Sequence, residues 1–92
     1  MKKTGAELIA IERQEQIDKH GRTIERDVNE NSNNELAIAA MGLIDKYPSS
    51  HNFPEHWDSK LIQKMISKPY KERLIIAGAF LAAEIDRVQI IN

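Results

Sequence analysis

The sequence predicts an all-α fold, a compact four-helix single domain that spans the whole chain and self-associates. Segment 72–92, ERLIIAGAFLAAEIDRVQIIN, is typical of one unbroken helix. Its stretch 74–83 holds only apolar residues and one glycine, which predicts that other helices cover it on every side. Two capping-box patterns, T-x-x-E at Thr4 and S-x-x-E at Ser32, indicate the starts of two further helices. No stretch has the alternating apolar pattern of a strand.

Composition narrows the class of protein. A chain of 92 residues buries only about 60–65% of its unfolded surface, so assembly would relieve a small core. Its 13 basic and 14 acidic side chains nearly balance, which argues against general nucleic-acid binding. Without cysteine, the chain has no disulfide and no thiolate metal site. The N-terminal sequence is too charged for a signal peptide or a membrane span, and we expect a cytoplasmic protein.

The first helix is expected from Thr4 to about Lys19, with Gly21 ending it. Arg13 falls at the centre of its apolar face, where three interpretations stay open. Its stem packs on the core while its head reaches water, or it forms a buried ion pair, or it binds an anion. Helical spacing gives that face four apolar members: Ala6, Ile9, Ala10 and Ile17.

The middle of the chain alternates between polar loops and short apolar segments. Segment 21–34 is rich in asparagine and predicts a loop with at most a helical turn. The second helix is expected over about 33–46 and the third from Pro54 or Asp58 to Ile66. Between them lie Phe53 and Trp57, flanked by histidines that we interpret as surface residues.

Four polar residues fall where helices should face one another: Arg13, Glu35, Arg73 and Glu84. If the first helix packs on the last, Arg13 and Glu84 can meet as a charge-assisted pair. Such a pair either holds the fold together or contributes to a ligand site, and the sequence favours the structural role.

A hydrolytic function is one alternative. Glu12 and Glu15 have the E-x-x-E spacing, which loosely resembles the helical MazG-type nucleotide pyrophosphohydrolases that use Mg²⁺. Asp86 lies about 160° from Glu84 around its helix, so the two acids cannot share a site. The fuller acidic motif of that family is missing. We therefore predict no catalytic residues, no metal ligands and no cofactor.

Binding of a small anionic ligand fits the inventory better. Guanidinium groups and an ammonium can bind phosphate, and Trp57 can stack on a base. The first turn of the last helix adds free N–H groups that favour anions. The predicted ligand-binding residues are Arg13, Arg22, Arg26, Asp27, Glu35, Trp57, Lys68, Arg73 and Glu84.

Several stretches are similar to short phage and prophage proteins that carry an E-R-Q-R-Q run, a G-W-x-x-x-x-D stretch, an E-L-A-x-A-A helix and a C-terminal A-G-A-L-x-x-A-E-I-x-R helix. Here the corresponding text includes IERQEQI, ELAIAA and RLIIAGAFLAAEIDR, with Glu15 and Arg22 departing from the pattern. The resemblance implies a phage accessory protein of the host cytoplasm, a class that includes oligomeric sponges for immune signals.

The sequence thus predicts a protein that binds and sequesters a phosphate-bearing nucleotide, such as a cyclic nucleotide or an ADP-ribose derivative, and so inhibits host defence. The alternatives are the Mg²⁺-dependent pyrophosphohydrolase and an inhibitor that binds a protein without any small ligand. We also expect a homo-oligomer that does not enter membranes.

Overall fold

The computed structural model describes residues 2–21 and 23–91, and its regular structure there is entirely helical. The all-α prediction is confirmed, but the expected number of helices is wrong, because segment 21–34 contains a helix of its own. Five α-helices and one 3-10 turn are present over the described ranges: α1 (Gly5–His20), α2 (Ile24–Glu30), α3 (Glu35–Ile44), η1 (Ser50–Asn52), α4 (Ser59–Ile66) and α5 (Tyr70–Ile91).

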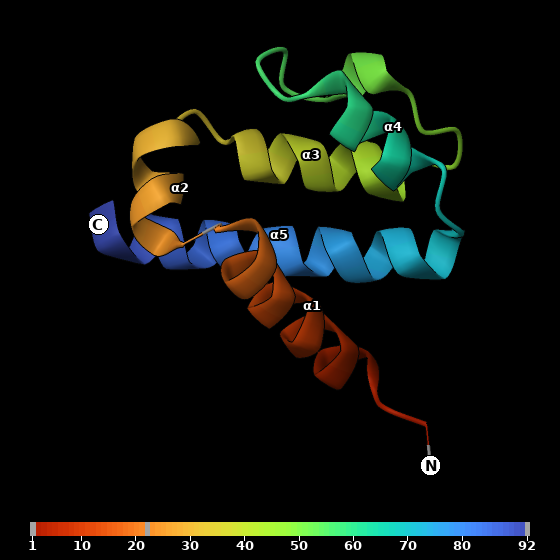
Figure 1. The fold of residues 1–92 in the computed structure, drawn as a ribbon, viewed down its shortest axis with the longest axis horizontal. Coiled ribbons are helices and arrows are strands. Elements are labelled where there is room, and N and C mark those ends of the chain that lie inside the picture. Colours follow the sequence, from red (N-terminus) through yellow and green to blue (C-terminus); the bar gives the residue numbers. More distant parts are fainter. Residues whose placement is uncertain (1, 22, 92) are drawn as a thin grey trace.

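The long helix α5 organises the fold, as its sequence predicts. Figure 1 shows α3 running alongside α5, α1 crossing it at an angle on the other side, and α2 lying across its C-terminal half. Helix α4 and η1 lie over α3 on one face of the molecule. The result is flattened, with extents of 35 × 34 × 22 Å. The expectation that α5 is covered on every side is wrong, since Leu74 and Leu81 remain exposed.

The core lies between α3 and α5 and is closed by α4. Leu36, Leu43 and Phe80 are completely buried there, and Ile62 and Met65 of α4 pack against them. The Trp57 and Phe80 rings meet in a T-shaped contact with 5.5 Å between their centroids. The irregular segment before α4 is therefore held to the core by its aromatic residues.

Helix α2 shows why a short polar segment can be helical. Thr23 caps it by accepting from the Arg26 backbone N–H at 3.3 Å, and Arg26 bonds Glu30 one turn later. Ile24 and Val28, the expected apolar residues of this segment, are half-buried. A seven-residue helix is not stable alone, so packing on α5 decides its conformation.

Three helix ends test the capping predictions. The capping box of Thr4 and Glu7 is present, and Gly21 ends α1 with a left-handed φ of 64°. The Ser32 box is wrong. Asn34 is the N-cap of α3 with a φ of 64°, and the Glu35 carboxylate accepts from the Asn33 backbone N–H at 2.6 Å. The chain must change direction sharply between α2 and α3 within four residues, which a left-handed residue allows.

The predicted inner face of α1 is wrong in part. Ala6 and Ala10 are exposed, whereas Arg13 and Gln16 are buried. The reason is the oblique crossing in Figure 1, which covers only one side of the helix. At the crossing, Ile9 lies directly over Gly78 of α5, whose missing side chain allows the close approach.

Gly42 of α3 gives a prediction about packing. A Cβ atom there would lie 2.9 Å from Cε1 of the buried Phe53 ring. We expect Gly42→Ala to lower the free energy of unfolding by about 1–2 kcal/mol, because overpacking outweighs the gain in helix propensity. Urea denaturation measures this change. Gly5→Ala is the control, because nothing lies within 4 Å of that position; equal stability of the two variants would contradict the packing argument.

Candidate functional site

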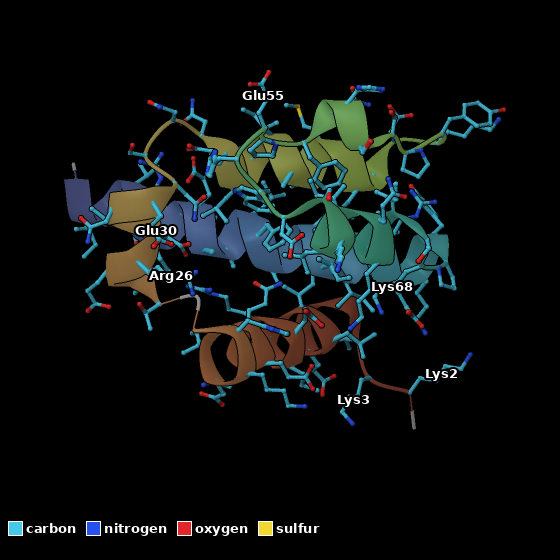
Figure 2. The ribbon with its side chains drawn as sticks, turned by 45° about the horizontal axis from the view of Figure 1, so that its top comes forward. Lys2, Lys3, Arg26, Glu30, Glu55 and Lys68 are labelled. Carbon is cyan, nitrogen blue, oxygen red and sulfur yellow. The ribbon has the colours of Figure 1, made fainter. Side chains whose placement is uncertain are left out.

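The predicted site residues do not form one site. Figure 2 shows Arg26, on α2, at the opposite end of the molecule from Lys68, which follows α4. Most of the others take part in polar contacts that hold helices together. Arg22 lies outside the described residues.

Glu84 pairs with Arg87 and not with Arg13, which corrects the expected ion pair. Arg87 donates from Nε to Glu84 Oε1 at 2.6 Å and from Nη2 to Oε2 at 2.9 Å. Its guanidinium also bonds Asn34 Oδ1 at 3.2 Å and the Ser32 carbonyl at 3.5 Å. The hydrogen bond that Arg87 donates to the Glu84 carboxylate raises the pKa of Arg87 above its usual value. This arginine, missed from the sequence, fixes the α2–α3 turn on α5; its E-x-x-R spacing was the available signal.

Arg13 lies between two aspartates of other helices. Its Nη2 is 4.0 Å from Asp27 of α2 and 3.6 Å from Asp86 of α5. The polar contacts continue from Asp27, which accepts from Asn31 Nδ2 at 3.0 Å, to Trp57, which donates from Nε1 to Asn31 Oδ1 at 3.2 Å. This series of polar contacts joins α1, α2 and the segment before α4. It supports the interpretation of Arg13 as part of a buried ion pair.

Arg73 binds backbone carbonyls. It donates to the carbonyl oxygens of Leu43 at 2.8 Å, Asp45 at 2.9 Å and Lys68 at 3.1 Å. The first two are among the carbonyls that the end of α3 leaves without helical partners. The Tyr70 ring also faces the guanidinium, with 5.3 Å from Cζ to the ring centroid. These contacts give Arg73 a structural role at the start of α5.

A cavity of about 290 Å³ between α1, α4 and α5 is the best candidate for a ligand site. Its floor is apolar, and its rim carries basic side chains from the α4 end and carboxylates from α1 and α5. Lys68 is the predicted site residue that contributes to it (Figure 2). The lining residues are Glu12, Glu15, Gln16, His20, Leu61, Lys64, Met65, Lys68, Glu72, Ile75, Ile76 and Phe80.

Gln16 lines this cavity and carries a buried hydrogen-bond acceptor. Its side chain is buried, with 2% of its surface exposed. Its Nε2 donates to Glu12 Oε2 at 3.3 Å. Its Oε1 has no hydrogen-bond partner among the described residues. Because a buried acceptor left without a donor costs about 1–3 kcal/mol, a ligand that donates to Oε1 would be favoured.

A second cavity, of about 490 Å³, lies between α2 and α4. It brings together three predicted site residues, Arg26, Asp27 and Trp57. However, the Arg26 guanidinium is bonded to Glu30 at 2.6 Å and to the His20 carbonyl at 3.2 Å. Asp58 adds another acid to the lining. This cavity therefore suits a phosphate less well than the first. The remaining predicted residue, Glu35, has its carboxylate 3.9 Å from His56 Nε2.

The polar side chains do not group into a metal site within residues 2–21 and 23–91, where no three His, Cys, Asp or Glu residues are placed to hold an ion. None of the helices in these ranges is long and apolar enough to cross a membrane. Comparison with protein-family models, curated proteins and solved structures finds no match to this chain.

Proposed function

We propose that this protein binds a small phosphate-bearing nucleotide in the cavity between α1, α4 and α5 and sequesters it unchanged. The observation that carries the proposal is the lining of this cavity, which places apolar side chains and two lysines beside Gln16, whose buried Oε1 has no donor among the described residues. Nucleobases present N–H donors on their edges, and a carboxamide is a suitable partner for them.

The rest of the cavity suits the face of the nucleobase and the phosphate. The side chains of Leu61, Met65 and Phe80 provide apolar surface for a base. Lys64, in the last turn of α4, and Lys68, just after this helix, offer ammonium groups to a phosphate. Lys68 is 4.0 Å from Glu72 in a partly exposed pair, and a phosphate can compete for it because such pairs are weak.

The size of the cavity also bears on the ligand. At about 290 Å³ it lies near the lower limit of small-molecule sites, roughly 300–1,000 Å³. A mononucleotide fits this limit better than a large dinucleotide. In this proposal the protein lowers the free concentration of a signalling nucleotide, which is the activity that the resemblance to phage accessory proteins implies.

Calorimetry with a panel of nucleoside monophosphates, cyclic nucleotides and ADP-ribose tests the proposal, followed by chromatography of the ligand after incubation with Mg²⁺. We expect heat of binding with at least one compound and its recovery intact. Cleaved ligand would instead support hydrolysis, which the three carboxylates at the cavity, Glu12, Glu15 and Glu72, make the second candidate. No heat from any compound would overturn both and favour a protein target.

Charge reversal at the cavity rim gives a prediction with a matched control. We expect Lys68→Glu to weaken nucleotide binding at least about tenfold, because it replaces a phosphate donor with a like charge. Lys60→Glu, in the same helix α4 as Lys64 but outside the cavity lining, should leave the affinity unchanged. Gln16→Leu should also weaken binding while keeping the fold, since it removes the buried acceptor. Equal affinities of the two lysine variants would contradict this location of the site.

A further inference from the structure

Helix α5 carries an apolar stripe that the fold leaves largely exposed, except at Gly78, which Ile9 of α1 covers. Successive members are four, three, four and three residues apart, which places them on one side of the helix. Leu74, Leu81 and Ile85 are exposed, and Val88 is half-buried. We call this set the α5 stripe: Leu74, Gly78, Leu81, Ile85 and Val88.

The stripe lies on the opposite side of α5 from the core. At 100° per residue, Ile85 lies about 180° from Ile76, which packs in the core. Helix α1 borders the stripe where Ile9 covers Gly78. None of the five residues of the stripe has a charged side chain. Large exposed apolar side chains gathered on one side of a helix mark an interaction site.

The accessible surface of the chain is larger than that of an average monomer of its mass. The accessible surface is 6151 Å², whereas a monomer of this mass exposes about 5,400 Å². The excess is about 700 Å² and is close to the roughly 800 Å² that each partner buries in a standard interface. The excess is thus comparable in size to the area that one such contact buries on each partner.

The charges at the ends of α5 favour an antiparallel copy of the same helix. Lys2, Lys3 and Lys71 lie around a cavity beside Leu74, near the start of α5. The last turn of α5 has no basic residue to offset the negative end of its helix dipole. An antiparallel arrangement brings the lysines of each copy to the uncompensated end of the other.

We propose that two copies of this chain associate through their α5 stripes, antiparallel and related by a twofold axis that passes near Leu81. Each copy then uses the same surface, as a closed dimer requires. Leu81 meets its own copy at the axis, and Leu74 meets Val88 of the second copy. The dimer does not depend on the proposed nucleotide, because the stripe and the ligand cavity lie on different sides of α5.

Sedimentation equilibrium of the full chain tests this proposal with two variants of one residue type on one helix. Ile85 and Ile90 are 59% and 64% exposed, and they lie about 140° apart around α5. We expect Ile85→Glu to raise the dimer dissociation constant by about 100-fold or more, because two acids would face the apolar contact. Ile90→Glu should leave it unchanged. A wild-type monomer at high concentration, or equal effects of both substitutions, would overturn the proposal.

Cysteine cross-linking tests the orientation and does not require a charged substitution. The natural chain contains no cysteine, so one introduced thiol has only its own copy as a partner. Leu81→Cys should form a disulfide-linked dimer under mild oxidation. Leu74→Cys should not, since seven residues from the axis separate the two thiols by roughly 21 Å at 1.5 Å per residue. Linkage of both variants would show a parallel dimer, and linkage of neither would exclude the α5 stripe, so both outcomes would overturn the proposal.

Discussion

Replacing Arg87 with leucine is expected to lower the free energy of unfolding by about 3 kcal/mol, near the low end for breaking a buried ion pair. The guanidinium side chain is 4% exposed, and its partner Glu84 is 13% exposed. Removing Arg87 leaves the Glu84 carboxylate without its bidentate partner, and it releases the Asn34 side chain and the Ser32 carbonyl. Chemical denaturation followed by circular dichroism measures the loss.

The exposed pair of Arg26 and Glu30 is the control. Its Nε–Oε2 distance of 2.6 Å equals the Arg87 Nε–Glu84 Oε1 distance, but its side chains are 52% and 56% exposed. Arg26→Leu should change stability little, because water screens this pair. The double variant Glu84→Leu with Arg87→Leu should recover part of the loss, since no carboxylate then stays buried without a partner. Similar losses for the two arginines would show that burial is not the cause.

Replacing Arg73 with methionine is expected to cost about 2–3 kcal/mol, because one charged side chain serves three carbonyl oxygens. The effect should concentrate at the end of α3, where Leu43 and Asp45 lose their donor. Hydrogen exchange should therefore speed up in the last turn of α3 before it changes elsewhere. Thermal denaturation gives the overall loss.

Replacing Arg73 with lysine separates the effect of its positive charge from the effect of its hydrogen-bond geometry. Arg73→Lys keeps the positive charge but cannot present the planar fork of donors, so we expect a loss between those of the wild type and the methionine variant. If Arg73→Met left stability unchanged and abolished nucleotide binding, the structural role given to Arg73 would be wrong. The sequence-based prediction that Arg73 binds the ligand would then stand.

These arginines change how the candidate function is argued. The sequence hypothesis rested on several guanidinium groups meeting at one phosphate site. In the structure Arg13, Arg73 and Arg87 hold helices to one another, and Arg26 is bonded on the surface. The proposed site depends instead on Gln16 and on the two lysines at and after the end of α4.

Local chemistry allowed much of the fold to be predicted. The cap at Thr4, the end of α1 at Gly21 and the extent of α4 follow from side chains that act within a few residues. The length of α5 followed from its apolar and helix-forming sequence. The unexpected helix was α2, because seven residues with two apolar side chains give no periodic signal above that of a loop.

The sequence by itself determined that this protein is helical, where most of its helices begin and end, and that α5 is their common partner. Those properties depend on short-range hydrogen bonds and on apolar content. Only the tertiary structure decided that Glu84 pairs with Arg87, that Arg13 lies between Asp27 and Asp86, and that Gln16 faces a cavity. The physical reason is the oblique crossing of α1 over Gly78, which rotates the polar residues of α1 inward and leaves the rest of the α5 stripe open. Crossing angles depend on packing between distant residues, which no local pattern records.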